Sequence, residues 1–289
     1  NLFNLGRRTG IDLPGEARTD SLIYYPAGSA PSENLTMGAT DLATNSFGQN
    51  FNVTMIQMIT GFCSLINGGY YYEPHMVDKI TNSSGATVQN IEPRVLRQTI
   101  SESTSAKIRQ YCRATVMEEG GDRRTGRTAR PAGYAIGGKT GTAETIPRKN
   151  GEYVVSFMGY APADDPQIAI YVVVDRVNAS PQDDAKFATG IVRNVLTEVL
   201  PYLNIFMTEE LSEKEIQELA EKQIEITNQY TQKPEDGEDQ NNGDGTGDGQ
   251  TGDDQTGSGD GTGDAQGGDN TTPSEDWRNY PVDPATGYL

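Results

Sequence analysis

Residues 137–144 read GGKTGTAE and lie between two apolar runs, 134–136 (YAI) and 153–158 (YVVSFM). The two flanking runs are rich in β-branched and aromatic residues, so the region is predicted to form a strand, a turn and a second strand. Lys139 brings a fixed cation, Thr140 brings a hydroxyl that can bond a carboxylate, and the glycines allow another backbone to approach closely. These residue types suit a functional site, but the tripeptide alone fits an exposed strand end with a lysine equally well, so the choice between the two depends on the other motifs of the chain.

Two further apolar runs extend this unit into a sheet. The segment 147–151 (PRKNG) contains the turn dipeptide Asn-Gly, and 163–166 (ADDP) is a second turn that leads into 168–174 (IAIYVVV). Three strands joined by short turns predict an antiparallel meander. The last run is apolar on both faces, so helices are expected to cover the sheet on both sides. The fold class predicted is α+β, with helices packed on an antiparallel sheet.

The remaining elements follow from helical periodicity, capping residues and turn signals. Before about residue 50 the chain is expected to be mostly loop. A single strand-like segment is expected at 70–80, with His75 as a surface or structural residue, then a turn at 82–85 and a return strand at 87–88. Helices are predicted at 54–67, at 102–119 after the cap Ser101, at 184–200 and at 208–230. Their expected core stripes are Met55, Ile59, Phe62 and Ile66 in the first, Ile108, Tyr111, Cys112, Thr115 and Val116 in the second, and Phe187, Ile191, Val195 and Val199 in the third.

Charge divides the chain unevenly. The formal net charge of the 289 residues is −18; residues 233–289 contribute 14 acidic and 2 basic side chains, a net −12, which leaves −6 for residues 1–232. Residues 233–289 are Gly, Asp and Thr in near-repeats and are predicted to be a disordered acidic tail. Residues 208–232 are predicted to be a charged amphipathic helix. No basic stripe is interleaved with aromatic residues, so nucleic acid is excluded as a partner.

Cysteine and histidine usage argues against a metal or cofactor site. Cys63 and Cys112 fall in separate helical patterns without a metal-ligand spacing, and His75 is the one histidine. Free thiols are expected in preference to a disulfide. No apolar run reaches the ~20 residues of a membrane span. Because the sequence starts at Asn1 within a motif, we expect further residues to precede it.

The order of several motifs resembles that of class B penicillin-binding proteins. These motifs are TGIDLPGE at 9–16, SFGQ at 46–49, the Thr54-x-x-Gln57 helix start, NGG at 67–69 followed by Pro74, GKTGTA at 138–143 and SFMGYAP at 156–162. Lys-Thr-Gly on a strand is one of the three catalytic motifs of the serine penicillin-recognising enzymes. The resemblance identifies residues 1–207 as the C-terminal part of a transpeptidase domain.

One departure from the family pattern is clear. No serine stands three residues before any lysine, so the chain contains no Ser-x-x-Lys motif. Ser32-Glu33-Asn34 matches Ser-x-Asn by letter but follows the 9–16 motif, whereas the family's Ser-x-Asn precedes it, and we interpret the match as coincidence. The nucleophile and its base are therefore expected upstream of Asn1, and this chain alone is expected to be inactive.

The resemblance implies peptidoglycan D,D-transpeptidase chemistry by a domain that lies outside the cytoplasm and is held at the cell membrane by an anchor upstream of this sequence. A serine attacks the D-Ala-D-Ala stem peptide and forms an acyl-enzyme, and β-lactams acylate the same serine. Lys139 would supply positive potential, Thr140 and Thr142 would bind the terminal carboxylate, Gly141 would leave room for the substrate backbone, and the Thr142 backbone N–H would donate to the oxyanion. A glycosyltransferase would be among its partners in wall synthesis. The alternatives are a D,D-carboxypeptidase or β-lactamase relative, or a non-catalytic wall-binding protein.

Overall fold

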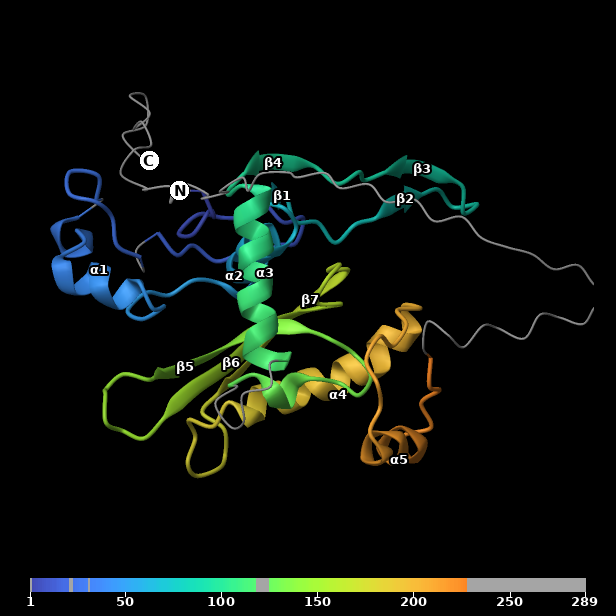
Figure 1. Ribbon diagram of the computed structural model, residues 1–289. Helices are drawn as coiled ribbons and strands as arrows, with labels where there is room; N and C mark the ends of the chain where they lie inside the picture. The colour runs from blue at the N-terminus through green and yellow to red at the C-terminus, as the bar shows by residue number, and fades with distance from the viewer. Residues whose placement is uncertain (1, 21–22, 31, 118–124, 228–289) are drawn as a thin grey trace, which may run out of the picture. The chain divides into compact units, whose positions relative to one another are not determined.

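The computed structural model describes residues 2–20, 23–30, 32–117 and 125–227 (Figure 1). These residues belong to the first of two compact units, Asn1–Glu235. The predicted acidic tail at 233–289 lies outside the described residues, as does the C-terminal end of the helix expected at 102–119.

The central element is the three-stranded sheet that the sequence predicts. Its strands are β5 (Gly137–Glu144), β6 (Tyr153–Ala161) and β7 (Ile168–Asp175), paired antiparallel in the order β5-β6-β7. The pairing of β5 with β6 runs without a bulge from Gly137↔Tyr160 to Glu144↔Tyr153. The meander prediction is confirmed, and β5 is an edge strand with one side unpaired by any other strand of the described chain.

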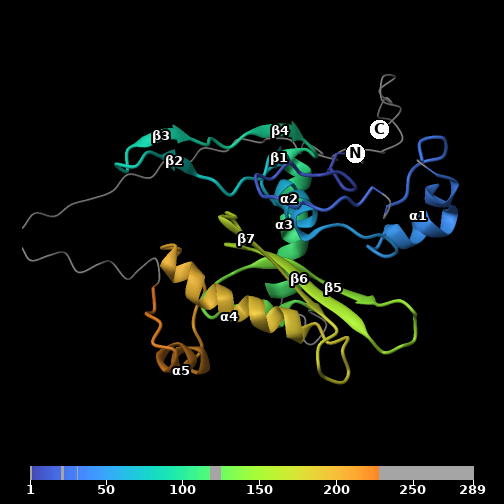
Figure 2. The same ribbon diagram turned by 180° about the vertical axis from the view of Figure 1, so that it is seen from behind.

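Helices cover both faces of this sheet, as predicted (Figures 1 and 2). On one face, α4 (Lys186–Tyr202) packs against Phe157 and the even-numbered residues of β7. On the other face, Phe62 and Ile66 of α2 (Met55–Ile66) pack against Tyr160. The helix α3 (Glu102–Met117) lies on the same side as α2, contacts β5 and begins after Ser101, whose Oγ accepts the Thr104 N–H at 3.2 Å.

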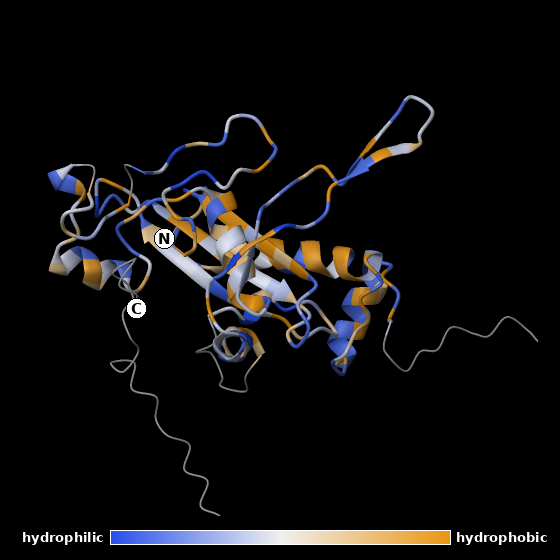
Figure 3. Cartoon of the chain, turned by 90° about the horizontal axis from the view of Figure 1, so that it is seen from above, coloured by the Kyte–Doolittle hydropathy of each residue, from blue (hydrophilic) through white to orange (hydrophobic). Residues whose placement is uncertain are grey.

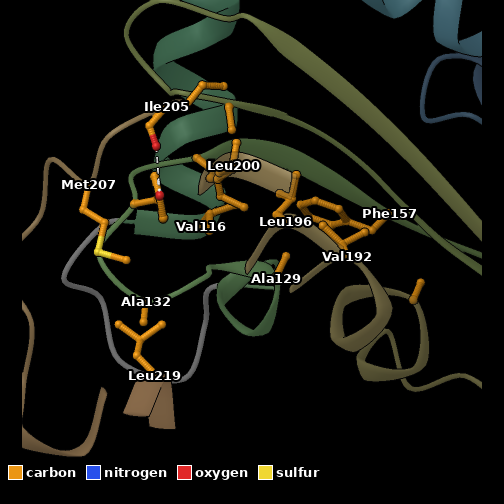
Figure 4. Packing of buried hydrophobic residues seen from close by; sticks show 14 residues of the cluster. Val116, Ala129, Ala132, Phe157, Val192, Leu196, Leu200, Ile205, Met207 and Leu219 are labelled. Atoms are coloured by element: carbon orange, nitrogen blue, oxygen red, sulfur yellow. Dashed lines mark hydrogen bonds between the residues drawn. The ribbon is translucent and has the colours of Figure 1, made fainter. Parts of the chain in front are cut away.

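The buried face of α4 differs from the prediction by one residue. Ile191 and Val195 are 44% and 40% exposed, whereas the fully buried apolar stripe is Ala188, Val192, Leu196 and Leu200. The last three of these residues are labelled in Figure 4. Both stripes have a spacing of four residues, and the alanine at position 188 made the real one look less apolar in sequence. Spacing alone does not determine which of two adjacent stripes faces a sheet.

The two helices on the opposite face also expose residues that were expected in the core. Met55 is 51% exposed because it is the first residue of α2, one turn before the helix reaches the sheet. Tyr111 of α3 is 71% exposed, while Val116 is fully buried. Cys63 and Cys112 are free and half-buried, and burial raises the pKa of each thiol.

The segment 70–99 forms two small two-stranded sheets, and the single strand expected at 70–80 is divided between them. The strands are β1 (Tyr70–Tyr72) paired with β4 (Val95–Gln98), and β2 (Lys79–Thr81) paired with β3 (Thr87–Asn90). The expected strand over 70–80 is broken after Tyr72, because Pro74 cannot donate a ladder hydrogen bond. The turn at 82–85 and the return strand are confirmed, and His75 is exposed. The β2–β3 hairpin projects away from the three-stranded sheet, with Ile80 and Val88 exposed (Figures 1 and 3).

The helix predicted at 208–230 is much shorter. It is α5 (Glu213–Glu221), which begins at a capping box in which Ser212 and Glu215 satisfy each other's backbone N–H groups. Before it, the Met207 N–H donates to the Thr227 carbonyl, so the chain doubles back instead of remaining helical. α5 is also held more firmly than its thin apolar seam suggests. Leu219 is 1% exposed and joins the core, and Arg130 pairs with Glu215 at 2.6 Å.

The first fifty residues are mostly loop, as expected, with a short 3-10 turn η1 (Glu33–Leu35) and the helix α1 (Ala39–Asn45). One buried side chain attaches their N-terminal part to α2. Gln57 is fully buried; its Oε1 accepts the Thr54 N–H at 2.9 Å and the Thr19 hydroxyl at 3.0 Å, and its Nε2 donates to the Arg7 carbonyl. The Gln57 carboxamide thus joins α2 to the N-terminal segment that contains Arg7 and Thr19.

Replacing Gln57 with alanine is expected to lower the free energy of unfolding by about 2 kcal/mol, because several buried polar groups lose their partner at once. Urea denaturation followed by circular dichroism measures the change. The matched control is Gln110→Ala, on the exposed surface of α3, which should change stability little. Equal effects of the two substitutions would contradict the role given to Gln57.

Candidate functional site

The Lys-Thr-Gly motif lies on the open edge of the sheet. Within a strand, the N–H and C=O groups of successive residues point alternately to the two sides. The Thr145 N–H donates to the Glu152 carbonyl across the β5–β6 hairpin, so odd-numbered residues of β5 direct their backbone groups toward β6. The backbone groups of Gly138, Thr140 and Thr142 consequently point to the open edge.

An independent contact agrees with this assignment. The side chain of Gln49 donates from Nε2 to the Thr142 carbonyl oxygen at 3.2 Å, from outside the sheet. The N–H of Thr142 points to the same side as its carbonyl. Gln49 was not predicted as a site residue. The available signal was its place in the SFGQ motif at 46–49, but nothing in that motif indicated a partner 93 residues away.

Lys139 is exposed, and its ammonium group folds toward the same edge. Its Nζ donates to the Thr140 carbonyl at 2.6 Å and reaches the Thr140 hydroxyl at 3.5 Å. Because the Thr140 carbonyl points to the open edge, the positive charge lies there too. Burial raises the pKa of the nearby Cys112 thiol, and the Lys139 charge partly opposes that rise. The site thus combines a cation with backbone N–H and C=O groups that are not paired with another strand of the described chain.

The threonines and Lys139 approach the edge from different faces. Side chains alternate along a strand, so Thr140 and Thr142 lie on the face opposite Lys139. The Thr142 side chain is exposed and that of Thr140 is half-buried. The four residues predicted for the site all lie on β5: Lys139, Thr140, Gly141 and Thr142. Lys139 and Thr140 are in direct contact.

The glycines of the motif serve packing against β6. A Cβ at Gly138 would overlap the Phe157 ring and would lie 2.7 Å from the Met158 carbonyl oxygen, and a Cβ at Gly141 would lie 2.5 Å from Ser156 Oγ. These clashes are with the neighbouring strand rather than with the open edge. The sequence interpretation of Gly141, as room for a substrate backbone, stays a prediction beside this packing role.

A cavity of about 510 Å³ borders the C-terminal half of β5. Its lining comes from residues 23–24, 48–52 and 143–146, together with Leu35, Arg148 and Val154. The cavity therefore begins where the Lys-Thr-Gly residues end, and an extended chain that followed the open edge would lead into it. Its lining mixes apolar residues with Glu144 and Arg148.

Other candidate groups lie outside this arrangement. The Ser32 hydroxyl donates to Asn34 Oδ1 at 2.5 Å in an exposed turn. Among the described residues, no group of three or more His, Cys, Asp or Glu side chains could hold a metal ion. Within the same residues, no helix has the length and apolarity needed to cross a bilayer.

Comparison with known proteins gives a consistent result. The family model described as the penicillin-binding protein transpeptidase domain matches residues 1–197. Stage V sporulation protein D of Bacillus subtilis is 37% identical over 235 residues, which are 78% of this chain and 33% of that protein. PbpB, a penicillin-binding protein of Mycobacterium tuberculosis, is 32% identical over 180 residues, 60% of this chain and 25% of that protein.

Solved structures agree with the sequence relatives. Penicillin-binding protein 3 of M. tuberculosis, in complex with ampicillin, superposes with a TM-score of 0.60 at 26% identity over 72% of this chain and 46% of that one. Penicillin-binding protein 2B of Streptococcus pneumoniae gives a TM-score of 0.57 at 26% identity, over 72% of this chain and 32% of that one. The chain spans about a third or less of the curated relatives it matches. This chain belongs to the transpeptidase family of the class B penicillin-binding proteins.

Proposed function

We propose that this chain supplies the Lys-Thr-Gly strand of a serine-type peptidoglycan D,D-transpeptidase. The observation that carries the proposal is the open edge of β5, where the backbone groups of Thr142 and the ammonium of Lys139 point to the same side. An extended peptide can add to such an edge as a further strand, held by main-chain hydrogen bonds. The D-Ala-D-Ala end of a stem peptide is the ligand that the family membership suggests.

In this mechanism the chain binds the stem peptide and stabilises the transition state. The nucleophile is a serine from a Ser-x-x-Lys segment outside this sequence. Attack on the penultimate carbonyl expels D-alanine and leaves an acyl-serine, which an amine of a second stem peptide resolves. The Thr142 N–H would donate to the oxyanion, a contact of a kind typically worth about 3–4 kcal/mol in the transition state. The hydroxyls of Thr140 and Thr142 would bind the terminal carboxylate, and Lys139 would supply positive potential.

The same reading extends to location and partners. The domain would act outside the cytoplasm, attached to the membrane by an anchor outside this sequence. β-Lactams would occupy the substrate's place, with their carboxylate on the threonine hydroxyls. A glycosyltransferase would deliver the glycan strands whose stem peptides are joined.

The test is covalent labelling with a fluorescent penicillin, read by gel fluorescence and intact mass. Protein expressed from the complete reading frame is expected to be labelled, and the 289-residue chain alone is not. A mass shift of the 289-residue chain would reveal a nucleophile within it. Absence of label on the complete protein would favour a non-catalytic wall-binding role, and rapid release of hydrolysed drug would favour a β-lactamase.

A further inference from the structure

One side chain from outside the sheet occupies the open edge of β5 at the Lys-Thr-Gly motif. The Gln49 carboxamide donates from Nε2 to the Thr142 carbonyl oxygen at 3.2 Å. The hydrogen bonds of a β ladder have the same length, about 2.7–3.2 Å between nitrogen and oxygen. Because the Thr142 carbonyl points to the open edge, the Gln49 nitrogen lies about where the backbone nitrogen of an added strand would lie.

The neighbouring outward carbonyl is engaged in the same way. The Thr140 carbonyl oxygen accepts from the Lys139 ammonium at 2.6 Å. Both carbonyl groups that the two threonines direct to the open edge thus accept a side-chain donor. A strand that adds to an edge presents N–H groups as well as C=O groups to it. Its N–H groups can bond these carbonyls only after the side-chain donors have moved away.

The backbone that carries Gln49 is fixed by contacts with α1. The Gln49 N–H donates to the Thr44 carbonyl at 3.0 Å. The side chain of the next residue, Asn50, donates to Asp41 Oδ1 at 2.9 Å and to the Tyr24 hydroxyl at 3.3 Å. The Gln49 carboxamide is therefore held beside the edge by backbone whose own bonds do not involve β5.

The contact itself is weak enough for a ligand to break. It is exposed and joins two neutral groups, so its net contribution is that of an ordinary neutral hydrogen bond. Rotation of the Gln49 side chain is sufficient to uncover the Thr142 carbonyl, and the main chain can stay in place. Gln49 also lines the cavity of about 510 Å³, which leaves space beside β5 for the displaced carboxamide.

We propose that Gln49 is a specificity-determining residue of the open edge, which selects ligands by the donor they bring to the Thr142 carbonyl. A ligand with an amide N–H at this position competes with Gln49 and must displace it. A ligand that uses only the Thr142 N–H, through a carboxylate or carbonyl oxygen, binds without this competition. The inference rests on the proposed function, because it takes the ligand of the edge to be a stem peptide or a β-lactam.

The experiment compares two β-lactams on protein expressed from the complete reading frame. A penicillin carries an acylamino side chain with an amide N–H, whereas a carbapenem carries a hydroxyethyl group and no amide N–H in its place. The second-order rate constant of acylation is measured for each compound by intact mass over a series of times. Gln49→Ala is expected to accelerate acylation by the penicillin roughly fivefold, the usual effect of one neutral hydrogen bond. Acylation by the carbapenem should not change.

Two further variants separate this effect from a general change in the protein. Gln49→Glu keeps the length of the side chain but replaces its donor by a carboxylate. The ratio of the penicillin rate constant to the carbapenem rate constant should rise as it does with alanine, because both compounds carry a carboxylate that the new charge affects alike. The matched control is Gln167→Ala, an exposed glutamine in the turn between β6 and β7, which should leave both rate constants unchanged.

The outcomes distinguish this inference from the proposed function on which it rests. An unchanged ratio in Gln49→Ala, or slower acylation by the penicillin alone, would overturn the role given to Gln49 and leave the proposed function standing. Partial loss of structure would slow both compounds and would not raise the ratio. Absence of acylation of the wild-type protein by either compound would overturn the proposed function, and this inference with it.

Discussion

Replacing Lys139 with alanine in the complete protein is expected to abolish acylation by a fluorescent penicillin. The substitution removes the cation at the open edge of β5, which contacts the Thr140 carbonyl at 2.6 Å. Loss of a single charged or donating group at such a site typically costs a factor of ~100 to 1,000 in rate. The rate constant for label incorporation, measured over a series of times, gives the effect directly.

Two controls separate this effect from unfolding. Lys107→Ala removes an exposed lysine from α3 and should leave labelling unchanged. The melting temperature of the Lys139→Ala protein should equal that of the wild type, because the Lys139 side chain is exposed. Undiminished labelling of a correctly folded Lys139→Ala protein would remove Lys139 from the proposed site.

Replacing Gly138 with alanine should cause a large loss of stability from a single methyl group. The added Cβ would overlap the Phe157 ring and would meet the Met158 carbonyl oxygen at 2.7 Å. The Phe157 side chain is fully buried, and Met158 belongs to the central strand, so neither can move away cheaply. Overpacking of this kind costs about 3 kcal/mol. Chemical denaturation of the 289-residue chain measures it.

The matched substitution is Gly190→Ala. Gly190 lies within α4, and a Cβ there meets no atom within 4 Å. Alanine is favoured over glycine inside a helix by about 1 kcal/mol, so this variant should be more stable than the wild type. If both glycine substitutions shifted stability in the same direction and by similar amounts, the packing explanation for Gly138 would be wrong.

The sequence predicted the parts of the fold that depend on neighbouring residues. The three strands of the meander were correct, because apolar runs and short turns such as 147–151 act locally. The phase of α4 was wrong by one residue, since the choice between Ile191 and Val192 depends on what the helix packs against. The length of α5 was overestimated because the chain turns back after the helix, so that the Thr227 carbonyl accepts the Met207 N–H. No local sequence pattern indicates that tertiary contact.

The site divides in the same way. Lys139, Thr140 and Thr142 could be identified because they form one continuous motif. The sequence could not show which backbone groups of β5 point to its unpaired side, because that depends on the register in which β5 pairs with β6. The long-range contacts of Gln49 and Gln57 could not be predicted for the same reason. Each acts on residues dozens of positions away, and no local pattern marks such a contact.

The open edge of β5 also has a consequence for how copies of this chain behave toward one another. An unpaired strand offers its hydrogen-bonding groups to any extended peptide, including the same strand of a second molecule, and such pairing starts aggregation. A lysine on an edge strand opposes it, because docking a second strand would bury its charge or bring two such charges together. Lys139 therefore also keeps the edge of β5 free of other chains in concentrated protein. A chain without the Lys139 side chain is expected to self-associate more readily.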